Sequence, residues 1–224
     1  EFDKFFIFAQ MDVSKKRTKR NVPEFEPPEK QYIERLHCQK EINFDIKNIK
    51  ILNSDNFKDM LSDYIYELNF PKDSILQEIK FLFTPMLQSI TLPGSLTTIG
   101  PRSFQKCKFL HQIEFIKNNN DENNLSYIGD NAFNRTIIES ITLPDKIKEI
   151  GSFCFPHTLK QIDFENGAPY LVKINDNAFD NTQIEIFKMP LNITLFIHAK
   201  NVFSNCKKLK TIIFDHYANK SKPF

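Results

Sequence analysis

The composition of this chain of 224 residues excludes several kinds of protein before any motif is considered. A net charge of +2 gives no strong global field for nucleic acid or for an acidic membrane surface. No stretch approaches the roughly 18 consecutive apolar residues that a membrane-spanning helix needs. Hydrophobic residues make up 41% of the chain, which is enough to form a core.

The N-terminal part is predicted to form a disordered or extended leader over residues 1–41. It contains the basic run Lys15–Arg20, followed by a polar stretch with several prolines. The run also fits a simple nuclear-import pattern, although such runs are common in solvated tails. The apolar run near Glu1 is too short for a signal peptide and lacks an initiating Met. Two alternatives stay open: the first residues are not native and Met11 is the start, or the chain is a fragment.

A different pattern covers residues 42–70. Alternating apolar residues between Ile42 and Ile51 predict a strand, and Ser54 can cap a short helix with apolar residues on one face. Because the terminal units of repeat arrays are atypical, we predict an N-terminal cap here. The C-terminal end offers no comparable cover, which leaves continuation past Phe224 or self-association at that end as alternatives.

From residue 71 to 224 the chain repeats one motif. The clearest copy lies at 87–107, with the pattern Leu-x-x-Ile-x-Leu-Pro-x-x-Leu-x-x-Ile-Gly-x-x-x-Phe-x-x-Cys. One apolar position recurs every 20 to 30 residues or so, the period range of leucine-rich repeats. Its members are Phe70, Leu92, Phe115, Leu143, Phe164, Met189 and Phe214.

Each position of the motif has a structural interpretation. The Ile-x-Leu alternation predicts a short strand with one buried face, and the prolines Pro71, Pro93, Pro144 and Pro190 end these strands. Gly100, Gly129 and Gly151 are predicted to be turn residues with positive φ, with Asn175 taking that place in one copy. One phenylalanine follows each turn, and we predict a buried stack of Phe104, Phe133, Phe155, Phe179 and Phe203.

This motif resembles the BspA-like, or treponema-type, leucine-rich repeat of anaerobic protist parasites and some oral bacteria. The resemblance covers about two thirds of the chain. It implies an α/β leucine-rich-repeat solenoid, a curved horseshoe with short strands, turns and single helical turns, which members use as surface antigens or adhesins. Two segments depart from the pattern and predict irregular curvature: the polar insertion 117–124, and 195–202, which lacks the Ile-Gly turn.

The sequence predicts no catalytic, metal or cofactor site. The 4 Cys include no Cys-x-x-Cys, and the 5 His form no pair at metal-ligand spacing. Cys107 and Cys206 share one repeat position several coils apart, too far for a disulfide, so all cysteines are expected to be free thiols. N-glycosylation triplets begin at Asn124, Asn134, Asn192 and Asn219 and matter only if the protein is secreted.

The predicted function is a non-enzymatic protein-binding or adhesion module that takes a protein or glycan partner on its concave face, with no small-molecule substrate. The outward strand residues that we expect to make contact are Asn69, Thr91, Glu114, Thr142, Asp163 and Lys188, flanked by Ser89, Gln112, Ser140 and Gln161. An ordinary solvated sheet face is the simpler interpretation of the same residues. The alternative function is an intracellular, including nuclear, scaffold or adaptor. The family resemblance favours the cell surface, whereas the missing signal peptide favours the cytoplasm.

Overall fold

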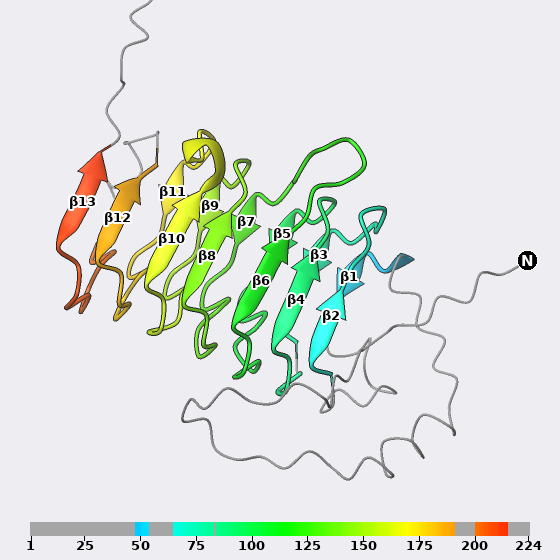
Figure 1. The fold of residues 1–224 in the computed structure, drawn as a ribbon, viewed down its shortest axis with the longest axis horizontal. Helices are drawn as coiled ribbons and strands as arrows, with labels where there is room; N and C mark the ends of the chain where they lie inside the picture. Colours follow the sequence, from blue (N-terminus) through cyan, green and yellow to red (C-terminus); the bar gives the residue numbers. More distant parts are fainter. Residues whose placement is uncertain (1–47, 54–64, 83, 191–199, 215–224) are drawn as a thin grey trace, which may run out of the picture.

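The structure is a computed structural model that describes residues 48–53, 65–82, 84–190 and 200–214. Over these residues the chain winds into a β-solenoid of about 6 turns, and successive coils lie side by side (Figure 1). A full coil contributes one longer strand and one strand of only two residues, which lie in different sheets. The repeat that is visible in the sequence therefore becomes a stack of parallel strands.

The longer strands carry the predicted Ile-x-Leu alternation. They are β2 (Glu67–Asn69), β4 (Ser89–Leu92), β6 (Gln112–Phe115), β8 (Ser140–Leu143), β10 (Gln161–Phe164), β12 (Ile186–Met189) and β13 (Thr211–Phe214). Paired neighbours are parallel and in repeat register, with Ile90 opposite Ile113 and Ile141 opposite Ile162. The predicted strands are confirmed in this register, and their inward residues are buried or partly buried from β2 to β12, whereas those of β13 are exposed.

The ladder of longer strands is interrupted twice. Hydrogen-bonded pairing joins β2, β4 and β6, then β8 and β10, then β12 and β13. β6 still contacts β8, and β10 contacts β12, without ladder pairing. Both breaks follow coils with Phe at the second inward position, Phe115 or Phe164, and with long connections to the next short strand, 116–126 and 165–172. The equivalent connections 93–97 and 144–148 are shorter, and their coils keep the ladder. The coil of β2 keeps it too, with Phe70 and the connection 70–77, so these two features alone do not determine a break.

A second sheet was not predicted from the sequence. It contains six two-residue strands in the order β1 (Ile51–Leu52), β3 (Glu78–Ile79), β5 (Thr98–Ile99), β7 (Tyr127–Ile128), β9 (Glu149–Ile150) and β11 (Lys173–Ile174). The isoleucines that we assigned to turns are its inward residues and are buried. The coil is therefore closed by strands on two sides, and the core lies between them.

The predicted α/β class with helical turns is not confirmed. Among the described residues, helix is confined to Asn48 and the 3-10 turn η4 (Glu165–Gly167), so the observed architecture is a β-solenoid. The predicted cap over 42–70 lies partly outside the described residues. Its described segments include β1 and β2, which pair with β3 and β4 as parts of the stack.

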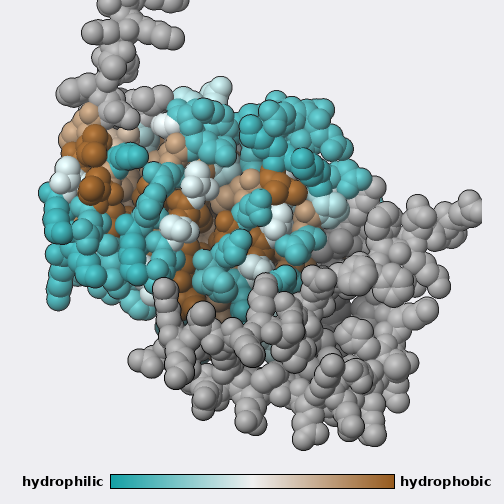
Figure 2. All heavy atoms as spheres, viewed as in Figure 1, coloured by the Kyte–Doolittle hydropathy of each residue, from teal (hydrophilic) through white to brown (hydrophobic). Residues whose placement is uncertain are grey.

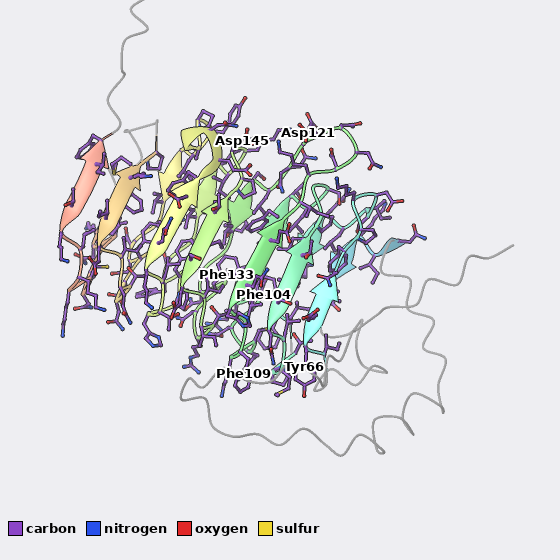
Figure 3. The ribbon with its side chains drawn as sticks, in the orientation of Figure 1. Tyr66, Phe104, Phe109, Asp121, Phe133 and Asp145 are labelled. Carbon is purple, nitrogen blue, oxygen red and sulfur yellow. The ribbon has the colours of Figure 1, made fainter. Side chains whose placement is uncertain are left out.

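The phenylalanine stack is confirmed. Adjacent ring centroids in the series lie 5.5, 5.9, 5.0 and 5.4 Å apart, and the rings are close to parallel, from Phe104 through Phe133, Phe155 and Phe179 to Phe203. Figure 3 shows Phe104 and Phe133 in neighbouring coils. Phe133 has no exposed surface. Because each of these five coils contributes one ring, the stack ties them together along the solenoid axis.

The prediction of positive φ at the repeat glycines is wrong. Among the described glycines only Gly167 has a positive φ. The repeat glycines are needed for close approach instead. A Cβ at Gly151 would lie 2.4 Å from the backbone N of Asp130, and one at Gly129 would lie 2.5 Å from the backbone N of Pro101. Neighbouring coils thus touch through backbone atoms at the repeat glycines. Asn175 stands at the equivalent position of the next coil, where its side chain donates a hydrogen bond to the Ile150 carbonyl at 2.9 Å.

The left-handed position lies two residues further along each coil. Its members have φ between 50° and 58°: Arg102, Asn131, Phe153, Asn177 and Asn201. Asn is the non-glycine residue that tolerates this conformation best, and it fills the position in three coils. Arg102 and Phe153 are the two exceptions. Phe153 is the bulkier of them, so its backbone is strained, and the residue is 42% exposed.

We therefore expect Phe153→Asn to stabilise the protein by about 1 kcal/mol, because the left-handed conformation costs an ordinary residue roughly 1–2 kcal/mol. Urea unfolding of both proteins measures the change. Phe81→Asn is the matched control, since Phe81 is 39% exposed but has no positive φ. An equal effect of both substitutions would show that the replacement of an exposed aromatic ring by a polar side chain, not backbone strain, is responsible.

Candidate interaction surface

The six residues predicted to make contact lie on one side of the solenoid. We call this side the ladder face and define it by the outward side chains of β2, β4, β6, β8, β10, β12 and β13. Strand register places Asn69 opposite Thr91, Thr91 opposite Glu114, and Thr142 opposite Asp163. Lys188 follows on β12 and forms an ion pair with Asp163 at 3.8 Å. The structure thus brings these residues into one row that spans the two breaks in the ladder.

The break between β6 and β8 opens a hollow at the centre of the ladder face. Its volume is about 380 Å³, and its walls come from β6, β8, β10 and their ends. Polar side chains dominate the lining: His111, Gln112, Glu114, Ser140, Thr142, Gln161, Asp163 and Glu165. Ile113 and Phe115 also line it and are only partly buried. In Figure 2, apolar atoms show between the hydrophilic side chains of this face. We call this hollow the central groove.

Three carboxylates belong to the central groove. Asp163 accepts a hydrogen bond from Gln161 and pairs with Lys188. The side chains of Glu114 and Glu165 have no hydrogen-bond or ion-pair partner among the described residues. Sequence analysis named Glu114 and Asp163 but missed Glu165 and His111, which lie just outside the predicted strands and carry no repeat signal. The groove is therefore polar and locally acidic.

Ion pairs between successive coils occupy other parts of the surface. Lys160 pairs with Glu139 and Lys210 with Glu185, each at 2.9 Å, directly before the longer strands. The hydrogen bond from Lys210 lowers the pKa of Glu185. On the opposite sheet, burial acts to raise the pKa of Glu149, but hydrogen bonds from Lys173 and Asn175 outweigh it and the pKa is lowered. These acids are neutralised locally, in contrast to Glu114 and Glu165.

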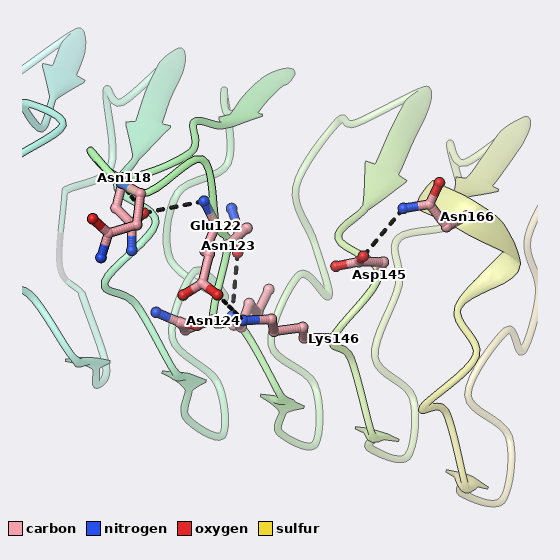
Figure 4. A network of polar contacts seen from close by, with 9 residues as sticks. Asn118, Glu122, Asn123, Asn124, Asp145, Lys146 and Asn166 are labelled. Atoms are coloured by element: carbon pink, nitrogen blue, oxygen red, sulfur yellow. Dashed lines mark hydrogen bonds and ion pairs between the residues drawn. The ribbon is translucent and has the colours of Figure 1, made fainter.

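The polar insertion is a loop at the upper edge of the solenoid in Figure 1, and Figure 4 shows its polar contacts. The Asn118 side-chain oxygen accepts hydrogen bonds from the backbone of Asn120 and Glu122, and Lys146 of the next coil pairs with Glu122 at 3.3 Å. The loop packs directly on Gly94, where a Cβ would lie 2.2 Å from the Glu122 carbonyl oxygen. The loop therefore packs on the preceding coil and is joined to the next coil by an ion pair. The second departure from the repeat, 195–202, lies largely outside the described residues.

The described cysteines Cys107, Cys154 and Cys206 are free, as predicted. Cys107 and Cys206 each contact a threonine hydroxyl, of Thr84 and Thr182, at 3.3 Å. Burial raises the pKa of Cys107 to about 11 and raises the pKa of Cys154 well above its ordinary value. The thiols of Cys107 and Cys154 pack as small core residues and are poor nucleophiles near neutral pH.

Two negative findings, on metal sites and on membrane-spanning helices, apply to the described residues only. No group of three or more His, Cys, Asp or Glu side chains in these residues is placed to hold a metal ion. No helix in the described part of the chain is long and apolar enough to cross a membrane.

Comparison with known proteins defines the family. The model of the BspA type leucine rich repeat region matches residues 34–125 and 126–222, with 6 copies. The chain belongs to this BspA-type leucine-rich repeat family. No curated protein sequence matches it.

One of the solved structures that the chain resembles, with a TM-score above 0.5, shares the fold. A leucine-rich cell surface protein from Faecalibacterium prausnitzii is 17% identical with a TM-score of 0.54, and the match covers 73% of this chain and 42% of that protein. The pneumococcal vaccine antigen PcpA is 19% identical with a TM-score of 0.46, and the match covers 73% and 50%. A leucine-rich repeat protein from Bacteroides ovatus is 21% identical with a TM-score of 0.41, and the match covers 67% and 38%. The chain thus spans half or less of the length of each.

Proposed function

We propose that this BspA-type repeat protein is a non-enzymatic binding module that takes a protein partner on its ladder face. The parallel register carries this proposal, because it places outward side chains from successive coils in one row. We further propose that this row is the concave side and that Asn69, Thr91, Glu114, Thr142, Asp163 and Lys188 make the contacts. Many modest contacts along a row suit an extended macromolecule, and a glycan would have to use the same polar row.

Adhesion at a cell surface is the setting that we favour. The support is the description of the Faecalibacterium protein as a cell surface protein, which shares the fold over 73% of this chain. The alternative is an intracellular scaffold or adaptor, including a nuclear one, for which the basic run Lys15–Arg20 is the motivation. Antibody labelling of the full-length product on intact and on permeabilised cells separates the two settings.

We also propose self-association at the end of the stack formed by β13. Ile212 and Phe214 occupy the inward column but are 39% and 47% exposed, and no described strand follows β13. An edge strand with exposed apolar side chains favours pairing with another chain. Sedimentation analysis over a range of concentrations tests this part of the proposal.

Charge reversal at the centre of the ladder face is expected to abolish partner binding. Glu114→Lys combined with Asp163→Lys turns two acidic groups basic, and Asp163→Lys places a second cation beside Lys188. Like charges at an interface cost several kcal/mol, so affinity should fall at least roughly a hundredfold. Binding of the purified full chain to host cells and matrix proteins is the measurement.

The matched control reverses two acids on the opposite sheet, Glu78→Lys and Glu149→Lys. Each double variant replaces two carboxylates with two ammonium groups, so the control changes the net charge by the same amount. Glu78 and Glu149 both form ion pairs, with Lys80 and Lys173, whereas only Asp163 of the test pair does. Both double variants must keep the β-sheet circular dichroism of the wild type. Equal loss of binding in the two variants, or no loss in the first, would rule out the ladder face as the binding surface.

A further inference from the structure

The proposed function leaves two features of the chain unexplained. One is the central groove, where Glu114 and Glu165 have no partner among the described residues. The other is the basic run Lys15–Arg20, which contains five cationic side chains within six residues and lies outside the described residues. The two features carry opposite charge, which raises the question of whether they meet.

The geometry of the groove limits what can enter it. β6 and β8 contact each other although their ladder is broken. Admitting another strand would require the two to stand about 10 Å apart, twice the usual spacing of neighbouring strands. The hollow of about 380 Å³ therefore suits individual side chains that reach in from a segment lying over the face.

The lining of the groove favours long cationic side chains. The partly buried Ile113 and Phe115 form an apolar floor. Glu114 and Asp163 lie beside it on β6 and β10, and Glu165 directly follows β10. Lys and Arg pack their aliphatic stems on apolar surface while their charged groups stay at a polar rim. Charge-assisted hydrogen bonds to Glu114 and Glu165 would satisfy acids that the described part of the chain leaves unpaired.

We propose that the chain's own basic segment, Lys15–Arg20, docks in the central groove and covers the middle of the ladder face. The inference rests on the proposed function, since covering this face regulates binding only if the face binds a partner. The proposed contact pairs the positive charges of the basic segment with the unpaired carboxylates of the central groove.

The covalent connection allows this contact. The chain between Arg20 and Asn48 can span up to roughly 90 Å when extended, at about 3.3 Å per residue. The groove lies only a few coils from β1, and adjacent coils are about 4.8 Å apart. Tethering also gives the segment an effective concentration that can reach the millimolar range, so individually weak ion pairs are sufficient.

Zero-length carbodiimide cross-linking of the full chain tests the contact, because it joins a lysine amine to a carboxylate only when the two touch. Mass spectrometry is expected to find amide links from Lys15, Lys16 or Lys19 to Glu114, Asp163 or Glu165. Their yield should fall roughly tenfold between about 0.01 M and about 1 M salt, as the Debye length shrinks from about 30 Å to about 3 Å. Links distributed evenly over the acids of both sheets would overturn the proposal.

Two pairs of variants test whether the carboxylates of the groove hold the basic segment. Glu114→Gln with Glu165→Gln should reduce the yield of the remaining link to Asp163, because the segment loses two of its three anionic contacts. Glu78→Gln with Glu149→Gln removes the same charge from the opposite sheet and should leave that yield unchanged. The reverse outcome, or equal loss in both variants, would contradict docking in the groove.

Isotope labelling decides whether the contact is internal. In a mixture of unlabelled and nitrogen-15 chains, docking within one chain gives links between peptides of the same label only. Links between differently labelled peptides would place the basic segment of a second copy in the groove and overturn the intramolecular form. Cross-links that persist while charge reversal leaves partner binding intact would refute the proposed function but not the docking. Missing cross-links with binding lost on charge reversal would refute only the docking.

Discussion

We expect Phe133→Ala to lower the free energy of unfolding by about 3 to 5 kcal/mol, the usual cost of truncating a large aromatic side chain in a packed core. The Phe133 ring has no exposed surface and stacks between Phe104 and Phe155, at 5.5 and 5.9 Å. Its removal leaves a cavity in the middle of the stack and separates two neighbouring coils. Urea unfolding followed by circular dichroism measures the loss.

Thr142→Ala is the control for this substitution. Thr142 lies on β8 of the ladder face with an exposed side chain that has no partner among the described residues, so the expected change is within about 0.5 kcal/mol. Thr142 and Phe133 lie in adjacent parts of the same coil, so the two substitutions test nearly the same place along the solenoid axis. Similar losses in the two variants would contradict the assigned inward and outward register.

The sequence was sufficient to predict features that recur in every coil. The phenylalanine stack and the inward residues of the longer strands follow from positions that must be apolar in each copy for a continuous core to form. Pro93 and Pro144 end their strands as predicted, and their carbonyl oxygens accept the hydrogen bonds of the turns that follow, from Leu96 and Ile147. Repetition supplies the same information several times, which makes these assignments secure.

The second sheet was missed because a strand of two residues leaves no alternation to detect. Thr98–Ile99 and Tyr127–Ile128 become strands only through hydrogen bonds to the coils on either side. The glycine that follows each of them was assigned a positive φ from its residue type and its place in the repeat. The actual reason for glycine at this position is close contact between the backbones of neighbouring coils. Pairing between coils cannot be deduced from the residues of one coil.

The central groove was missed for a related reason. It exists because the ladder is interrupted between β6 and β8, and an interruption is a departure from the repeat. The polar insertion after Phe115 signalled irregularity in that coil but not its consequence for strand pairing. Glu165 enters the site only because it follows β10 directly. Features that occur once in a repeat protein need the structure to be recognised.

The repeat glycines Gly100, Gly129 and Gly151 form a column in which the backbones of neighbouring coils come close together. Gly→Ala usually stabilises a protein by about 0.4–1 kcal/mol where the backbone permits it, because the unfolded chain loses entropy. We expect the opposite for Gly151→Ala, with a loss of roughly 3 kcal/mol, because overpacking against backbone costs about 1–3 kcal/mol or more. The new Cβ would meet the backbone N of Asp130 at 2.4 Å and its side-chain Oδ1 at 2.7 Å. That oxygen accepts the hydrogen bond from the Ser152 backbone, which would be disturbed as well.

Gly100→Ala provides the graded comparison in the same column. Its Cβ would lie 3.0 Å from the Ile79 carbonyl oxygen, and the next atom is 3.7 Å away, so a small shift relieves the contact. We expect a loss of about 1 kcal/mol or less there, measured by the same urea unfolding. If positive φ rather than close approach were the constraint, both substitutions would be penalised alike, since that cost does not depend on the distance to the preceding coil. A ranking with Gly151→Ala clearly the more damaging therefore identifies backbone contact between coils as the reason for glycine in this column.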